Sequence, residues 1–401
     1  MVTDIEMKEF SESAPFNNML YRIYKFINGE KMPPFKLVLT PTDRCNLNCI
    51  FCPNYVARKA GRFKKEDELT DEEWLKFVRE AIKMGVNDWL ILGGGEPWLR
   101  NELIIKILRE VKQKIKIPYF EIFTNGTLFE AEEIKTLIEL EPTRITVSVH
   151  ALGEEYAELT GSSKEMFSKV VENLKLLKLE KEKNKKTRPQ IQINMVINRK
   201  NYTKILEMVN FAKEVGANIL ALHPMRGYEE TREVISPLIL PPEKFPELKD
   251  YIEKGKKISE QFGILLDTTP LEPFMPMEKN ESLGVDRKLI LENIFKLRCF
   301  EPWYSMVINS DGLVGRCTAF IIRDEPLNIK NMSLEEIWYS DYFNQVRKNV
   351  VEGKMMVGCS QCGLMSTTAT LKRAFSHMED WMEGNITLKQ LRQILRGLST
   401  V

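Results

Sequence analysis

The chain has 401 residues, 43% of them hydrophobic, which is typical of a globular protein with one large domain and a smaller one. Its 58 Lys and Arg residues nearly balance its 57 Asp and Glu residues, and the net charge of +1 gives no field that favours nucleic acid or an anionic membrane. No apolar run approaches the ~20 residues of a membrane span, and residues 1–10 lack the pattern of a secretory signal. The seven cysteines are clustered, which argues against a secreted disulfide framework, so we expect a cytoplasmic protein.

The first part of the chain predicts a short lead-in followed by a regular α/β region. A helix is expected over about residues 17–28. From residue 35, β-branched apolar runs alternate with amphipathic segments, which indicates parallel strands joined by right-handed helical crossovers. Six such units predict an α/β barrel, closed or partial, although composition alone does not separate it from a doubly wound sheet. The expected strands cover residues 35–40, 88–92, 119–123, 144–149, 191–197 and 218–222, and the expected helices cover 69–84, 101–116, 131–140, 163–180 and 202–215.

Several prolines mark a change of organisation near residue 241. A helix over 242–262 and a short strand over 264–267 precede an irregular run, 269–286, that we expect to cross the open side of the barrel. Asp311-Gly312 lies between two β runs and predicts a hairpin turn that brings Cys299 and Cys317 together. We therefore divide the chain into a lead-in (1–34), a core (35–240), a bridge with a helix (241–298), a cysteine-bearing domain (299–363) and a helical tail (364–401).

Cys45, Cys49 and Cys52 stand at Cys-x3-Cys-x2-Cys spacing directly after the first expected strand. Such short gaps let three thiolates converge on one metal centre, and thiolates are soft ligands that select zinc, Cu(I) or iron–sulfur clusters. Three ligands on a centre with four positions leave one position open for a further ligand. A structural zinc site with a distant fourth ligand is the alternative.

A glycine-rich turn, Gly93-Gly94-Gly95-Glu96-Pro97, follows the second expected strand. Glycines allow a backbone to come close to a ligand because no Cβ intervenes. Together with the cysteine triplet, this turn resembles the radical S-adenosylmethionine (SAM) superfamily. The resemblance implies a partial (β/α)6 barrel of the TIM type over roughly residues 35–240. It also implies a 4Fe–4S cluster on the three cysteines, with the amino and carboxylate groups of SAM on the fourth iron.

The resemblance further implies which residues contact SAM. The family motif has two glycines before the glutamate, so Gly94, Gly95, Glu96 and Pro97 are the carried-over positions for the SAM amine. Ser148, at the end of the fourth strand, matches a position where family members often place a hydroxyl against the ribose or carboxylate, and a purely structural serine is an equal alternative. The other expected contacts are Phe51 near the adenine, and Asn125 and Asn194 at the ribose.

Other candidates lie near the expected substrate cavity. His150, just past the fourth strand, is on the carboxyl edge of the sheet, where the functional groups of α/β barrels gather. His223 and Arg226 follow the sixth strand, and Trp303 with Tyr304 precede the predicted hairpin. His223, Arg226, Trp303 and Tyr304 are candidates for the lining of this cavity. For His223 and Arg226, an ordinary loop role is the favoured alternative.

Four further cysteines, Cys299, Cys317, Cys359 and Cys362, form a second set. Cys-x12-Gly-x4-Cys followed by Cys-x2-Cys resembles the auxiliary-cluster domain of the SPASM/twitch radical SAM subfamily. The twitch version with one cluster fits better, because the full SPASM set needs seven cysteines in this region. The resemblance implies a small C-terminal α+β domain. Its four thiolates would saturate an auxiliary 4Fe–4S cluster, and a four-cysteine zinc site is the alternative.

The resemblance implies an enzyme that cleaves SAM reductively to methionine and a 5′-deoxyadenosyl radical, which removes a hydrogen atom from an unactivated C–H bond. We expect a small-molecule substrate, because the lead-in is too short for a separate peptide-recognition domain. We also expect a net oxidation assisted by the auxiliary cluster, a flavodoxin- or ferredoxin-like electron donor, and few conventional catalytic side chains. A peptide-modifying maturase, resembling an anaerobic sulfatase maturase or an enzyme that modifies ribosomal peptides, is one alternative. A non-enzymatic iron–sulfur or zinc electron carrier or scaffold is another.

Overall fold

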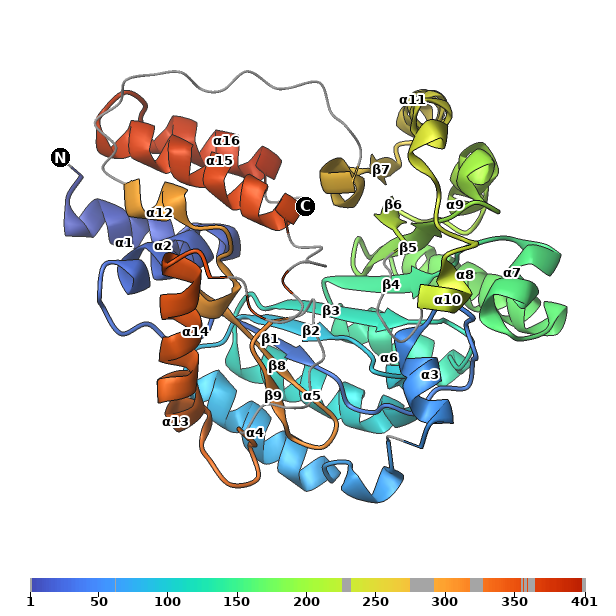
Figure 1. Ribbon diagram of the computed structural model, residues 1–401, viewed down its shortest axis with the longest axis horizontal. Coiled ribbons are helices and arrows are strands. Elements are labelled where there is room, and N and C mark those ends of the chain that lie inside the picture. The colour runs from blue at the N-terminus through green and yellow to red at the C-terminus, as the bar shows by residue number, and fades with distance from the viewer. Residues whose placement is uncertain are drawn as a thin grey trace.

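A computed structural model of the chain (Figure 1) describes residues 2–61, 63–225, 232–274, 292–317, 327–354, 356, 359 and 365–398. Its strands form one sheet in the order β7-β6-β5-β4-β3-β2-β1-β8-β9. Strands β1 to β7 follow one another in chain order, pair in parallel and alternate with helices, so the sheet is a partial barrel and not a doubly wound sheet. The strands are β1 (Lys36–Leu39), β2 (Asp88–Ile91), β3 (Tyr119–Thr124), β4 (Arg144–Ser148), β5 (Gln190–Ile197), β6 (Ile219–Pro224), β7 (Leu265–Asp267), β8 (Ser305–Ile308) and β9 (Val314–Gly315).

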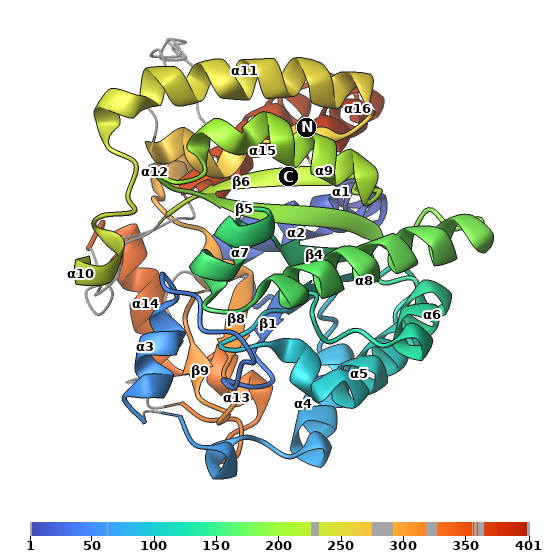
Figure 2. The ribbon, with the colours of Figure 1, turned by 90° about the vertical axis from the view of Figure 1, so that its right-hand side faces the viewer.

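Helices cover the outer face of this sheet, as the alternating sequence pattern predicts. In β5, Ile191 and Ile193 belong to the same buried core as Leu174 and Leu177 of the preceding helix, α8 (Lys164–Lys183). Figure 2 shows α8 and α9 lying over β4 to β6. The α/β barrel expected from the sequence is thereby confirmed. The covering helices are α4 (Asp71–Lys83), α5 (Asn101–Lys114), α6 (Ala131–Leu140), α8 (Lys164–Lys183), α9 (Ile205–Glu214) and α11 (Phe245–Gln261).

Two helices that the sequence pattern does not predict are α3 (Pro53–Lys59) and α7 (Gly153–Thr160). Both are too short to show a clear helical period. Pro53 fits the first turn of α3 because proline has no N–H to bond there, and Gly161, with φ +58°, ends α7 in the left-handed conformation. The remaining short helices are α10 (Arg232–Ile235), η1 (Lys65–Asp67), η2 (Pro97–Arg100), η3 (Tyr202–Lys204), η5 (Pro242–Lys244), η6 (Thr269–Phe274) and η7 (Glu301–Trp303).

The lead-in and the helical tail pack together on one side of the barrel (Figure 1). They share a second buried core, in which the rings of Phe10 and Trp381 lie 5.4 Å apart between centroids. Arg392 donates to the carbonyl oxygen of Glu9 at 3.0 Å. No helix in the described part of the chain combines the length and the hydrophobicity that a bilayer crossing requires. The helices of this layer are α1 (Asp4–Glu12), α2 (Pro15–Ile27), α12 (Glu292–Lys296), α15 (Met365–Met382) and α16 (Leu388–Leu398).

The predicted C-terminal hairpin is present and extends the barrel sheet. β8 and β9 pair in antiparallel fashion, Gly312 takes φ +86°, and the Asn309 N–H donates to the Leu313 carbonyl oxygen at 2.9 Å. β8 also pairs in parallel with β1, with Ser305 opposite Lys36, so this region shares a sheet with the core. The bounds of the five predicted segments stay predictions. Most of the irregular run expected over 269–286 lies outside the described residues, from residue 275 onward.

Arg347 connects this C-terminal region to the lead-in. It lies on α14 (Asp341–Val351), which follows α13 (Leu334–Trp338), and is 7% exposed. Its guanidinium donates to the carbonyl oxygens of Pro302 and Trp338, both at 2.9 Å. The same group lies 4.5 Å from the ring centroids of Phe26 and Trp338, which is within cation–π range.

Replacing Arg347 by methionine is expected to lower the free energy of unfolding by about 2–4 kcal/mol, because two buried carbonyls lose their donor and a cation–π contact disappears. Urea unfolding followed by tryptophan fluorescence measures this change. Arg79→Met is the matched control, since Arg79 is exposed and pairs with Glu110 at the surface. If the free energy of unfolding falls no more in Arg347→Met than in Arg79→Met, the role given to Arg347 is contradicted.

Candidate cofactor site

The first three cysteines lie in a loop between the carboxyl end of β1 and the start of α3. Backbone hydrogen bonds attach this loop to the end of α7. The Asn48 N–H donates to the Thr160 carbonyl oxygen at 3.0 Å. The Ile50 N–H donates to the Leu159 carbonyl oxygen, also at 3.0 Å. The unexpected helix α7 is therefore a support of the cysteine loop.

Cys45, Cys49 and Cys52 are each half-buried. Burial raises the pKa of the Cys45 and Cys49 thiols, and the neighbouring Cys52 raises both further because thiolates repel one another. The three sulfurs thus interact electrostatically, although within the described ranges no three His, Cys, Asp or Glu side chains are already arranged to hold a metal ion. Three thiols on one short loop fit a 4Fe–4S cluster with one open iron. Their ligand role stays a prediction.

The glycine turn after β2 packs directly against the cysteine loop. The Gly95 N–H donates to the Thr42 carbonyl oxygen at 3.0 Å, and the Glu96 N–H donates to the Arg44 carbonyl oxygen at 2.7 Å. A Cβ at Gly95 would overlap the Arg44 backbone. A Cβ at Gly94 would likewise overlap the side chain of Asp43. Glycine is therefore required by the close approach of two protein segments, a reason that the sequence pattern does not reveal.

The side chain of Glu96 connects the ends of β2 and β3. It is 2% exposed, and its carboxylate accepts from the Trp98 N–H at 2.9 Å and from the Thr124 hydroxyl and Asn125 N–H at 2.6 Å each. Burial raises the pKa of Glu96 to about 7, although these donors act in the opposite direction. Pro97, next in the chain, is buried at the start of η2. The contacts of Glu96 are thus with protein groups, and its expected role at SAM stays a prediction.

A polar network joins the cysteine loop to the end of β3. Asn125 donates from Nδ2 to Asn46 Oδ1 at 2.9 Å, and Asn46 donates from Nδ2 to the Thr127 hydroxyl at 2.8 Å. The Thr127 hydroxyl donates back to Asn125 Oδ1 at 2.7 Å, which closes the ring of contacts. Asn125 is therefore at the expected site, but its side chain holds the loop in place. The sequence does not single out Asn46 or Thr127 for this role. Each is simply a polar residue in an expected loop, which does not indicate its partner.

The inner face of the barrel carries a polar wall. In β4 and β5, alternate apolar residues point to the outer core, so Thr146, Ser148, Gln192 and Asn194 point to the inner face. Ser148 lies opposite Asn194 in the register of these strands, and Gln192 donates to Asn194 Oδ1 at 2.7 Å. Thr146 donates to Glu121 Oε1 of β3 at 2.6 Å. Two of the residues expected near the ribose, Ser148 and Asn194, are thus neighbours.

The structure also brings Phe51, His150 and His223 together at the mouth of the barrel. The rings of Phe51 and His150 lie 5.0 Å apart between centroids, edge to face. His150 Nδ1 accepts from the Val196 N–H at 3.1 Å, so the neutral ring carries its proton on Nε2. Burial, with a smaller contribution from the nearby His223, lowers the pKa of His150 to about 4. His150 is therefore a neutral group at physiological pH.

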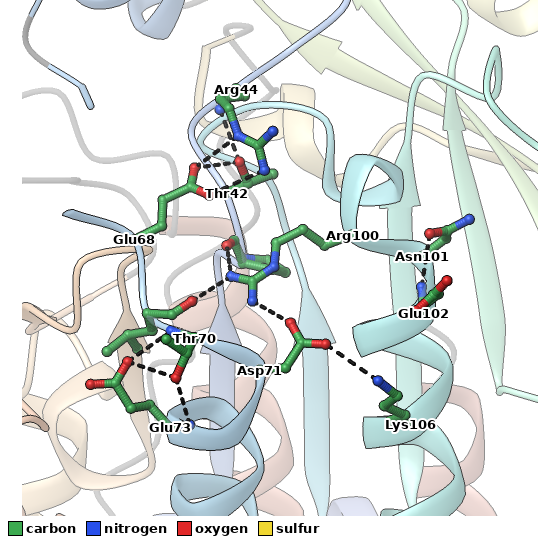
Figure 3. Close-up of polar contacts among 12 residues, drawn as sticks. Thr42, Arg44, Glu68, Thr70, Asp71, Glu73, Arg100, Asn101, Glu102 and Lys106 are labelled. Carbon is green, nitrogen blue, oxygen red and sulfur yellow. Dashed lines mark hydrogen bonds and ion pairs between the residues drawn. The ribbon is translucent and has the colours of Figure 1, made fainter. Parts of the chain in front are cut away.

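Figure 3 shows the ion pairs and hydrogen bonds that hold the chain on either side of the cysteine loop. Arg100 donates to the carbonyl oxygens of Pro41 and Leu69 at 3.0 and 2.8 Å, and it pairs with Asp71 at 2.5 Å. Arg44, the residue before Cys45, pairs with Glu68 at 3.3 Å. None of these long-range partners is visible as a motif, because each contact depends on the fold.

The later cysteines are partly described. Cys299, Cys317 and Cys359 are half-buried, and Cys362 lies outside the described residues. The pairing expected between Cys299 and Cys317 stays a prediction, as does the auxiliary cluster. Trp303 and Tyr304 are buried in the second core and do not line the barrel mouth, because their rings pack with the lead-in and tail helices. Arg226 also lies outside the described residues.

Sequence families match both cysteine regions. The profile of the radical SAM superfamily matches residues 39–212, which contain the first three cysteines and the glycine turn. Residues 39–212 thus form a radical SAM domain. The profile of SPASM, an iron–sulfur cluster-binding domain, matches residues 299–363, which contain the four later cysteines. Together these domains imply SAM and 4Fe–4S clusters as cofactors.

The radical SAM relatives include enzymes of two kinds. A probable GTP 3′,8-cyclase from Sulfurisphaera tokodaii is 31% identical over 193 residues, which are 47% of this chain and 56% of that protein. A PqqA peptide cyclase from Gluconobacter oxydans is 26% identical over 328 residues, which are 79% of each protein. The chain spans about half the length of the first curated relatives that it matches.

A solved structure shows a similar fold. The crystal structure of Streptococcus suis SuiB bound to S-adenosylmethionine superposes with a TM-score of 0.61 at 19% identity, covering 89% of this chain and 78% of SuiB. This likeness supports the fold of the partial barrel.

The His150→Asn variant tests whether the histidine is held neutral by burial. Because the folded-state pKa of about 4 lies below the ordinary value of 6.5, the unfolded chain binds more protons between these values. We expect the wild-type free energy of unfolding to fall relative to that of His150→Asn as the pH is lowered from 6.5 towards 4. Urea unfolding at several pH values measures this difference, with pH 7.5 as the reference where both side chains are neutral. A difference that stays constant over this range would show that His150 is not buried as described.

Proposed function

We propose that this chain is a radical SAM oxidoreductase that abstracts a hydrogen atom from an unactivated C–H bond of a polar substrate. The observation that carries the proposal is the joining of the cysteine loop to the glycine turn at the carboxyl edge of the barrel. When bound there, a 4Fe–4S cluster with SAM supplies one-electron cleavage of SAM to methionine and a 5′-deoxyadenosyl radical. A flavodoxin- or ferredoxin-like donor and a cytoplasmic location belong to the same proposal.

The residues of the chain bind and orient these groups. Cys45, Cys49 and Cys52 would hold three irons and leave the fourth open. The backbone of Gly94 and Gly95 borders the same loop, which supports the proposed contact with the SAM amine. Phe51 and His150 form one wall at the mouth of the barrel, where a nucleoside would be shielded from water.

The polar inner wall supports a substrate with hydrogen-bonding groups. Ser148, at the carboxyl end of β4, lies beside Asn194 of β5. Asp267, at the end of β7, lies in the same row, separated from Asn194 by the small side chain of Ala221. The hydroxyl, amide and carboxylate groups of these side chains can hydrogen-bond to hydroxyl, amino or amide groups of a substrate. A polar small molecule is therefore our first candidate, and the auxiliary cluster would assist its net oxidation.

A peptide substrate is the second candidate, and the relatives favour it. The PqqA peptide cyclase of Gluconobacter oxydans is matched over 79% of its length. SuiB has also been solved bound to its precursor peptide SuiA. The inner wall is compatible with a peptide, because amide and side-chain groups present the same donors and acceptors as a polar small molecule.

Anaerobic reconstitution tests the proposed function. With iron, sulfide, dithionite and SAM, we expect about eight irons per chain, as two four-iron clusters require, and release of 5′-deoxyadenosine. Cys49→Ala is expected to lose this release, because the SAM-binding cluster loses one of three ligands. Cys359→Ala is the matched control, since it removes a ligand of the other site and should still cleave SAM. Zinc in place of iron, with no cleavage by the wild type, would favour the carrier or scaffold alternative.

Deuterium transfer distinguishes the two substrate classes. Extract from cells grown in heavy water is separated into a small-molecule fraction and a protein and peptide fraction, and each is added to the reconstituted chain with SAM. We expect deuterium to appear in 5′-deoxyadenosine with the small-molecule fraction, because the radical takes its hydrogen from the substrate. Label transferred only from the protein and peptide fraction would make the peptide candidate the correct one.

A further inference from the structure

Arg58 occupies a central place beside the cysteine loop. It lies on α3, six residues after Cys52, and its side chain is directed back over the loop. One nitrogen, Nη1, donates to the Asp43 carbonyl oxygen at 3.3 Å and to the Gly94 carbonyl oxygen at 3.5 Å. The other, Nη2, donates to the Leu47 carbonyl oxygen at 3.4 Å.

These three acceptors come from three different parts of the site. Asp43 precedes Cys45, Leu47 lies between Cys45 and Cys49, and Gly94 belongs to the glycine turn. Each contact is long and individually weak. Together they place one planar guanidinium between the loop and the turn, a geometry that a single-point ammonium does not reproduce.

The charge of Arg58 lies against the loop that carries the thiols. Its guanidinium donates to the carbonyl oxygen of Leu47, which stands between Cys45 and Cys49 in the chain. The partners of Arg58 are backbone carbonyls, which do not neutralise its charge. The charge of Arg44, in contrast, is paired with the carboxylate of Glu68. The positive charge of Arg58 is therefore available to negative groups on the loop.

We propose that Arg58 is a positioning residue of the three-cysteine site, which holds the cysteine loop against the glycine turn and stabilises the reduced cluster by its charge. This inference rests on the proposed function. Reduction adds one electron, supplied by the reductant, and requires no proton or bond change in the protein. Because the reduced cluster with its three thiolates carries one more negative charge, a nearby cation stabilises it more than the oxidised cluster.

The test is the midpoint potential of the SAM-responsive cluster, measured by EPR-monitored titration of the reconstituted full chain. In Arg58→Gln we expect a more negative potential, corresponding to roughly tenfold less reduced cluster at a fixed potential. Arg58→Lys should keep the potential but release iron faster to a chelator, because it retains the charge and loses the planar fork. Lys59→Gln is the matched control, since it removes the same charge from an exposed position on the same helix.

An unchanged potential in Arg58→Gln, or an equal shift in Lys59→Gln, would overturn the inference. If Arg58→Gln binds no cluster, Arg58→Lys decides: iron loading with the wild-type potential supports the proposal, and a shifted potential overturns it. Failure of the proposed function looks different, because a wild-type chain with loaded iron would then release no 5′-deoxyadenosine. An unchanged potential in a chain that does cleave SAM rejects the role of Arg58 alone.

Discussion

The structure depends on the contact between the cysteine loop and the glycine turn. Two backbone hydrogen bonds, from Gly95 to Thr42 and from Glu96 to Arg44, hold the end of β2 against the residues that lead to Cys45. This approach is so close that a Cβ at Gly94 or Gly95 would overlap the loop. The glycines therefore allow the turn that we propose to bind SAM to lie beside the cysteine loop.

The surrounding fold positions the two segments for this contact. Consecutive parallel strands bring their carboxyl ends to one edge, where the turn after β2, the end of β3 and the loop after β1 meet. Glu96 and Asn125 then join these segments through buried hydrogen bonds. The pairing of β8 with β1 carries the later cysteine region onto the same sheet, and Arg347 anchors it to the lead-in. Both proposed metal sites thus share one framework.

Local sequence patterns predict much of this molecule. The alternation of strands and helices and the Asp311-Gly312 turn are visible because each depends on neighbouring residues. The radical SAM and SPASM motifs are visible from the spacing of their cysteines and glycines. The pairing of β8 with β1 is not visible, since it joins residues about 270 apart in the chain. The short helices α3 and α7 lack a clear period, and the contacts of Asn46, Arg58 and Arg100 exist only once the fold has formed. The sequence pattern singles out Gly94, but it does not reveal that the side chain of Asp43 occupies the space that a Cβ at this position would need.

The central claim is that the three cysteines leave one iron open and that SAM occupies it. The most direct measurement is electron–nuclear double resonance on the reduced, reconstituted chain with SAM labelled with ¹⁷O in its carboxylate and ¹⁵N in its amino group. The account predicts hyperfine coupling of both labels to the cluster. Coupling to neither label, in a chain that holds its iron and sulfide and is mixed with excess SAM, would contradict the claim.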